Sequence, residues 1–221
     1  VGSLINDKKL GLVSANLNVH GSSKENIAAQ GHIYDFDYNG YNYRSLNLNA
    51  TYRNKRLEGK ADIDDPNVQI RAMGMFVKNG KTPNLQLKAN VAHLAPHTLR
   101  LTNKWEQTAF SGNIECDIKG NNINNADGSI ELHDFVMRAP DTEYAINNVS
   151  IKTGYDNDNH FLDVDSDFGT IDINGHFSYN TIARSVLNMV AAKLPTIPGL
   201  THQPQREFND FTLNASLNST E

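Results

Sequence analysis

The segment ANLNVHG, residues 15–21, shows the pattern on which the interpretation of this chain depends. Its apolar residues alternate with polar ones, and the run ends in Gly21. Because successive side chains of a β-strand point to opposite sides of a sheet, the alternation predicts a strand with one apolar and one hydrated face. The segment CDIKG, residues 116–120, shows the same alternation and also ends in glycine. The same kind of strand is therefore expected in two distant parts of the chain.

Alternation with a period of two residues continues through most of the 221 residues. Asn, Asp, Lys, Ser and Thr occupy one phase of these runs, and aliphatic residues occupy the other. The pattern predicts a mainly β protein with more strand than the roughly 20–25% of an ordinary globular domain. The apolar phase contains Val13, Leu17, Val19, Leu46, Leu48, Val68, Ile70, Leu85, Leu87, Ile114, Ile118, Val149, Ile151, Ile171 and Ile173.

Asn-Gly and Asp-Gly pairs separate several of these runs and predict tight hairpin turns. Both residue types adopt the positive φ angles that two-residue hairpin loops require. The pairs are Asn39-Gly40, Asn79-Gly80, Asp127-Gly128 and Asn174-Gly175.

The chain also aligns with itself. Gly21 matches Gly120 at an offset of 99, and Gly74 matches Gly175 at an offset of 101, with the apolar phase preserved. A sheet segment with one apolar face needs a neighbour to continue its core, so tandem copies are expected to stack. We predict a first β repeat over residues 1–105 that ends in a turn or short helical segment. A second repeat over 106–200 ends in a helix, and residues 201–221 begin a third.

One segment has helical periodicity. Over residues 181–194, Ile182, Val186, Met189 and Val190 follow i, i+4, i+7, i+8 spacing, and Pro195 comes directly after this range. This spacing predicts a short amphipathic helix whose apolar face carries these four residues. Such a face packs against the end of a sheet or lies on a membrane surface, and the sequence leaves both options open.

Composition excludes some classes of function. There are 20 Lys and Arg against 25 Asp and Glu, and no basic cluster of the kind that nucleic-acid binding requires is present. The single cysteine, Cys116, lies in phase with Ile114 and Ile118, which favours a small buried side chain over a reactive thiol. No apolar run approaches the roughly 18 residues of a membrane span. No signal peptide is evident, and the chain starts and stops inside strand-like sequence. We therefore expect a soluble piece of a longer protein.

Two candidate metal sites are weak. His93 and His97 are four residues apart, but Pro96 lies between them and no third ligand is local. Residues 156–167 are rich in Asp, yet Phe161 stands at the sixth position, where a calcium-binding EF-hand loop needs glycine. No nucleophile elbow, phosphate-binding loop or paired-cysteine motif occurs in the sequence. We expect no metal, cofactor or catalytic residue, and thus a protein that is not an enzyme.

Taken together, the strand-ending segments SANLNVHG (14–21) and GNIECDIKG (112–120), the run IDDPNVQIRAMGMF (63–76) and the connection LQLKANVAHLAPHTLRLT (85–102) resemble the TamB-like, AsmA-related envelope proteins of didermal bacteria. The resemblance extends over residues 12–217. It implies an elongated, curved, U-shaped sheet, the half-open groove called a β-taco. It also implies a periplasmic protein that is anchored in the inner membrane and contacts a TamA-like outer-membrane assembly protein through parts outside this chain.

For this family the resemblance implies phospholipid transport between the two membranes and a role in outer-membrane protein assembly and secretion. The fifteen apolar-phase residues given above are then candidates for a groove that holds phospholipid acyl chains, in a chain that we expect to be a monomer. The alternative is a structural or adhesive β-repeat with a dry core that acts as a spacer or binds proteins. An envelope hydrolase with carboxylates at the rim of the sheet is a third interpretation.

Overall fold

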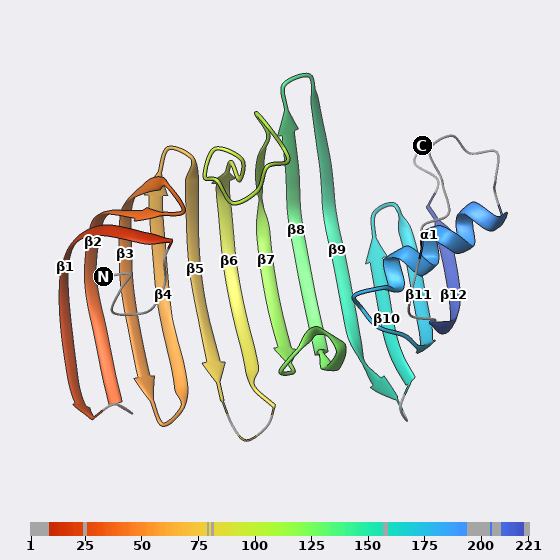
Figure 1. Cartoon of the computed structure of the whole chain (residues 1–221), viewed down its shortest axis with the longest axis horizontal. Coiled ribbons are helices and arrows are strands. Elements are labelled where there is room, and N and C mark those ends of the chain that lie inside the picture. Colours follow the sequence, from red (N-terminus) through yellow and green to blue (C-terminus); the bar gives the residue numbers. More distant parts are fainter. Residues whose placement is uncertain are drawn as a thin grey trace.

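In a computed structural model the chain forms one antiparallel sheet of twelve strands and a short helix (Figure 1). The structure describes residues 9–23, 26–78, 80, 82–156, 159–193, 204 and 209–218. The prediction of a mainly β protein is confirmed, because strands hold 71% of these residues. The elements are β1 (Leu10–Ser23), β2 (Asn26–Tyr38), β3 (Tyr41–Arg53), β4 (Arg56–Asp65), β5 (Val68–Val77), β6 (Asn84–Leu94), β7 (Ala109–Lys119), the 3₁₀ turn η1 (Ile123–Asn125), β8 (Asp127–Ala139), β9 (Thr142–Asp156), β10 (Asn159–Ser166), β11 (Gly169–His176), α1 (Ile182–Lys193) and β12 (Asp210–Leu217).

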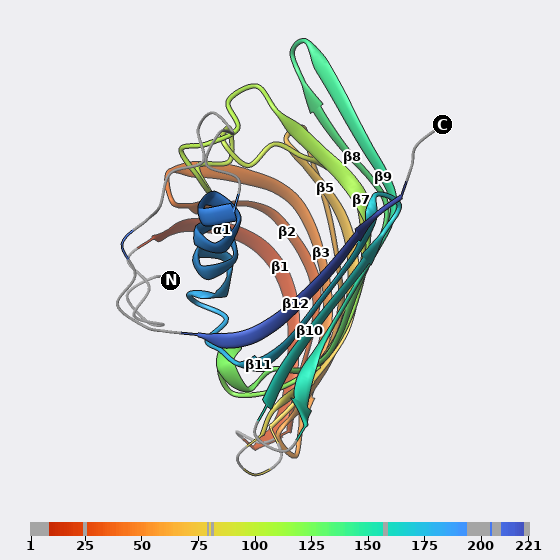
Figure 2. The same cartoon turned by 90° about the vertical axis from the view of Figure 1, so that its right-hand side faces the viewer.

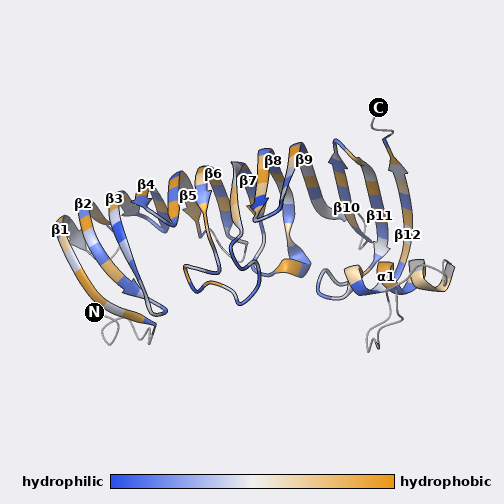
Figure 3. Cartoon of the chain, turned by 90° about the horizontal axis from the view of Figure 1, so that it is seen from above, coloured by the Kyte–Doolittle hydropathy of each residue, from blue (hydrophilic) through white to orange (hydrophobic). Residues whose placement is uncertain are grey.

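The strands follow one another in space as they do in the sequence, from β1 to β12. The sheet continues without a break from β6 to β7, where Leu87 pairs with Cys116. Residues that are paired across antiparallel strands lie on the same face, so the pairing register aligns the apolar phases of successive strands. Figure 3 shows the resulting alternation of hydrophobic and hydrophilic residues along the strands.

The hairpin predictions are partly confirmed. Asn39 and Gly40 form the turn between β2 and β3 with φ angles of 51° and 78°. The predicted turns at Asp127-Gly128 and Asn174-Gly175 are wrong, because these residues belong to β8 and β11. Gly128 is needed there for another reason: a Cβ atom would collide with the backbone of Asp117 on the neighbouring strand. Asn79 lies outside the described residues.

A line of irregularities bends the sheet. Register shifts occur between Gln69 and Ile70, between Val91 and Leu94, and between Ser111 and Asn113. In β3, Ser45 has a φ of 54°, and Tyr43 and Leu46 face the same side although they are three residues apart. Because such bulges bend a strand and increase its twist, one face of the sheet becomes concave. Figure 2 shows the strands curving toward the side of the sheet on which α1 lies.

The core consists of two separate clusters on the concave face. In the first, Leu99 of the connection between β6 and β7 is fully buried against Tyr43 and Val68. In the second, Ile182 at the start of α1 packs on Ile173 and Phe177. The predicted helix is thus confirmed over Ile182–Lys193, while Leu194 lies outside the described residues. The segment predicted as a turn or short helical segment contains helix-like hydrogen bonds from the Leu99 amide to the Ala95 carbonyl and from the Arg100 amide to the His97 carbonyl.

Among the described residues, no helix has the length and apolar character to span a membrane.

Candidate functional site

The apolar rows of the concave face form the candidate site. One row crosses all twelve strands. It joins Val19, Ala29, Ala50, Gly59, Gly74, Leu87, Cys116, Ile130, Ile151, Val164, Ile171 and Ala215. Residues in each pair of this row face the same side, so the row is a continuous strip of aliphatic side chains, glycine and Cys116 across the sheet.

A second apolar row flanks the first on one side. It joins Leu17, Gly31, Leu48, Ala61, Ala72, Ala89, Ile114, Leu132, Val149, Ser166, Gly169 and Leu217. A third row, on the other side, joins Gly21, Ile27, Tyr52, Leu57, Phe76, Leu85, Ile118, Gly128, Thr153, Leu162, Ile173 and Leu213. Ser166 and Thr153 are the interruptions by polar side chains, and both lie toward the C-terminal part of the sheet.

The fifteen groove residues named from the sequence all lie on this face. Eleven belong to the three rows, and Leu46 and Ile70 belong to a fourth row, which pairs them with Ile63. Val68 is part of the cluster around Leu99, and Val13 pairs with Phe36, which packs against that cluster. The structure therefore brings these residues together on one side of the sheet.

The rows differ in how much of them is covered. Val68 and Ile173 are buried beneath Leu99 and Ile182, so internal packing uses these two side chains. Val19, Leu85 and Ile171 remain exposed. Farther along the strands that carry the Leu99 cluster, β3 to β6 form an open apolar hollow of about 250 Å³, whose lining includes Leu48, Leu57, Ala72, Phe76 and Leu87. The concave face thus has parts that are covered and parts that are open.

A second hollow of about 380 Å³ lies beside the β6–β7 connection. Its lining includes Val91, Leu94, Trp105, Phe110 and Phe135. The Trp105 ring meets Phe110 edge-to-face, with the ring centroids 5.2 Å apart. Neither Trp105 nor Leu99 was singled out from the sequence, since both stand in a connection without periodicity. The only available signal was the apolar cluster around Pro96.

The helix uses part of its predicted apolar face. Ile182 is buried, and Val186 packs against the Ile173 and Phe177 cluster. Met189 is exposed, and the side chain of Val190 lies outside the described residues. Leu187 is also exposed, so α1 adds apolar surface to the concave side as well as covering its C-terminal part.

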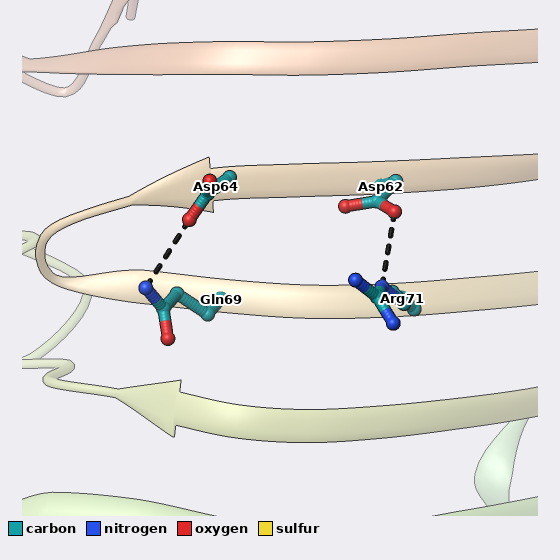
Figure 4. Close-up of polar contacts among 4 residues, drawn as sticks. All are labelled: Asp62, Asp64, Gln69 and Arg71. Carbon is teal, nitrogen blue, oxygen red and sulfur yellow. Dashed lines mark hydrogen bonds and ion pairs between the residues drawn. The ribbon is translucent and has the colours of Figure 1, made fainter.

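The opposite face of the sheet is hydrated and carries cross-strand polar pairs. The Arg71 Nε atom lies 3.1 Å from a carboxylate oxygen of Asp62, and the Gln69 amide donates to Asp64 over the same distance (Figure 4). Lys88 and Glu115 form a similar ion pair at 2.7 Å. Exposed pairs of this kind contribute at most about 1 kcal/mol each. The broad hollow of about 1080 Å³ on this face is lined by amide and charged side chains together with Tyr34 and Met73.

The geometry gives little support to the candidate metal sites and to a reactive cysteine. Among the described residues, no three His, Cys, Asp or Glu side chains gather as a metal site would require. His93 pairs with Gln69 at the end of β6, and His97 lies in the connection that follows. Asp163 and Asp165 lie on the polar side of β10, opposite Lys152 and Ser150, as the alternation predicted, while Asp158 lies outside the described residues. Burial raises the pKa of the Cys116 thiol, which keeps the thiol protonated and unreactive at neutral pH.

Comparisons of the chain with family models, with curated proteins and with solved structures found no match.

Proposed function

We propose that this chain is a non-enzymatic segment of a TamB-like periplasmic protein, and that its concave face holds phospholipid acyl chains during transport between the inner and outer membranes. The observation that carries the proposal is the set of three apolar rows that cross all twelve strands on one face. Exposed apolar surface that is continuous over this length is uncommon on proteins without an apolar partner.

Acyl chains suit the chemistry of this face. Burial of an acyl chain contributes about 0.8 kcal/mol for each CH₂ group and needs no directional polar contact. A face of Leu, Val, Ile, Ala and Gly supplies that burial without selecting one headgroup. The hydrated opposite face suits an aqueous compartment such as the periplasm. On this proposal the protein transports lipid by surface contact, and no catalytic group takes part.

Recurring hydrogen bonds support the proposed tandem repeat. The His32 ring nitrogen Nδ1 lies 2.8 Å from the Asn47 amide oxygen across β2 and β3. His133 and Asn148 repeat this contact at the same distance across β8 and β9. The offsets are 133 − 32 = 101 and 148 − 47 = 101, which match the offset between Gly74 and Gly175. We assign the copies to residues 1–105 and 106–200, with 201–221 as the start of a third, in a half-open, U-shaped sheet.

The remaining parts of the proposal concern the longer protein. The inner-membrane anchor and the contact with a TamA-like outer-membrane assembly protein are placed outside this chain, as is any role in protein assembly and secretion. Within the chain itself we propose a monomer whose partners are phospholipid acyl chains.

Two positions on β5 provide a matched test. Phe76 lies on the concave face and is 38% exposed, while Met73 lies on the hydrated face of the same strand and is 49% exposed. A photo-crosslinking amino acid is placed at either position, and the purified chain is irradiated with phosphatidylethanolamine and phosphatidylglycerol vesicles. We expect lipid adducts at position 76 several-fold above those at position 73. Equal labelling of the two positions, or no labelling at position 76, would contradict the proposal.

A spacer with a dry core is the second candidate function. It is favoured by Leu99 and Ile182, which fill parts of the concave face with the protein's own side chains. The two functions differ in what a charge does in the apolar rows of the face. In a dry core, Leu48→Asp or Ile151→Arg leaves a buried unpaired charge and unfolds the chain. In an open groove the charge stays hydrated, so thermal unfolding changes little while lipid crosslinking at position 76 is lost.

A further inference from the structure

The hollow beside Trp105 differs from the rest of the concave face because it is walled on more than one side. The connection between β6 and β7 forms one wall, and β6 to β8 form the floor. Ser111 and Trp105 are the lining residues with polar side-chain atoms, and the Ser111 Oγ accepts a hydrogen bond from Arg138 at 3.3 Å. The remaining side chains of the lining are apolar.

Water is a poor occupant of this hollow. A buried water molecule needs two to four polar partners, and apolar cavities without them stay dry. A peptide segment is also a poor occupant, since its backbone N–H and C=O groups would lose water and gain no hydrogen bond from apolar walls. At about 380 Å³ the hollow nevertheless lies within the size range of small-molecule sites. These conditions favour an unbranched hydrocarbon chain.

The hollow is continuous with an open apolar row, and the Leu99 cluster covers the face next to it. Ile114 and Leu132, which line it, belong to the apolar row that continues to Val149 on β9. Toward β5, Leu99 is fully buried and occupies the face above Tyr43 and Val68. A chain that follows the row from β9 therefore enters the hollow beside the connection.

The backbone of the connection holds Trp105 at the rim. Arg100, Trp105 and Gln107 have φ angles of 57°, 60° and 51°, in the left-handed region that residues with a Cβ atom rarely adopt. Such conformations persist only where the surrounding structure holds them, and they are frequent at ligand-binding sites. The indole ring packs on Phe110 and remains 52% exposed, so it faces both the hollow and the solvent.

We infer that the hollow beside Trp105 is a discrete binding site for one lipid acyl chain. The inference rests on the function proposed above and adds that lipid is held at a defined place on the concave face. The connection between β6 and β7 acts as a wall of this site.

The chain contains one tryptophan, so the fluorescence of Trp105 reports on this site directly. We would titrate the purified chain with 9,10-dibromostearate below its micelle-forming concentration, with stearate as the unbrominated control. Bromine quenches tryptophan only at short range. We expect saturable quenching by the brominated acid and none by stearate.

Leu132→Phe, which enlarges a side chain in the lining, should reduce the quenching several-fold with little change in thermal unfolding. Ile114 lines the same hollow, so Ile114→Phe serves as the second variant if Leu132→Phe does not fold. The matched control is Met75→Phe, which places the same ring on the hydrated face of β5 and should leave quenching unchanged.

The outcomes separate this inference from the proposed function. Lipid adducts at position 76 together with no quenching of Trp105 would overturn the inference alone. Quenching that neither filling variant reduces would place the acid on the outer side of Trp105 and would also overturn it. Absence of both signals would remove the site and the lipid function together.

Discussion

Tyr41, the first residue of β3, donates a 2.6 Å hydrogen bond to Asp65, the last residue of β4. Asp65 is 1% exposed, and its carboxylate also accepts from the backbone amides of Arg44 and Asn67 at 3.1 and 2.8 Å. A buried carboxylate is stable only when hydrogen bonds replace its lost hydration. This carboxylate therefore joins the start of β3 to the turn between β4 and β5, at the edge of the Leu99 cluster.

Removal of this carboxylate should destabilise the chain. Asp65→Ala leaves three donors without their acceptor in a buried place, and we expect a loss of about 3 kcal/mol in the free energy of unfolding. Urea unfolding followed by tryptophan fluorescence provides the measurement. The matched control is the neighbouring Asp64→Ala, because Asp64 is exposed and accepts one bond from Gln69. Equal losses for the two variants would contradict the role assigned to Asp65.

Tyr41 also makes stability depend on alkaline pH. Its pKa is raised above the ordinary value of 10.0, first by burial and then by its hydrogen bond to Asp65. The unfolded chain therefore ionises this phenol at a lower pH than the folded chain. The free energy of unfolding should be constant near pH 8 to 9 and should fall as the pH rises past about 10.

Other tyrosines also contribute to this loss of stability at alkaline pH, since burial raises the pKa values of Tyr43 and Tyr179 as well. Above pH 10, the free energy of unfolding of Tyr41→Phe should therefore fall less steeply with pH than that of the unmodified chain, but it should still fall. The variant is also expected to be less stable at pH 8. Urea unfolding of both proteins between pH 8 and 11 measures the two slopes. Equal slopes would show that Tyr41 does not contribute.

Leu99 should contribute more to stability than any other residue of its connection. Its side chain is 0% exposed, and truncation to alanine leaves a cavity between the connection and the sheet. We expect Leu99→Ala to lower the free energy of unfolding by about 3 kcal/mol. Leu101→Ala in the same connection removes an exposed side chain and should change stability by less than about 0.5 kcal/mol. Similar losses for both variants would mean that the connection does not pack as described.

Attachment of α1 to the sheet should depend on Ile182. Ile182→Asp places a charge in the buried contact with Ile173 and Phe177, and we expect the helix to separate from β11. Leu187→Asp is the control, because that side chain is exposed on the same helix. Hydrogen exchange of the α1 amides should become fast in the first variant and stay slow in the second. Slow exchange in both would show that other contacts hold the helix.

The sequence predicted the strands well because alternation is a local property. Leu17, Leu48 and Ile151 were assigned to one face, and the pairing register places them there. The helix was also predictable, since its spacing and the proline that follows it are local signals. Asp127-Gly128 was misassigned as a turn because glycine also serves where two backbones approach closely within a sheet.

Features that depend on distant residues were not predictable. The left-handed backbone at Ser45 brings Tyr43 and Leu46 to the same face, which simple alternation places on opposite sides. Leu99 and Trp105 gain their importance from strands that precede and follow their connection. No periodic pattern in residues 95–108 signals a buried leucine or the rim of a hollow. The covered and open parts of the concave face emerge only in three dimensions.

The order of the strands has a consequence for how the chain folds. Each strand pairs with the strands that precede and follow it in the sequence, so every closing loop of the sheet is short except the connection between β6 and β7 and the one that contains α1. Local pairing of this kind gives a low contact order and lets structure grow from any hairpin toward both ends. Mechanical pulling on the two ends should accordingly release hairpins one after another at modest force, since no single long-range contact locks the whole sheet.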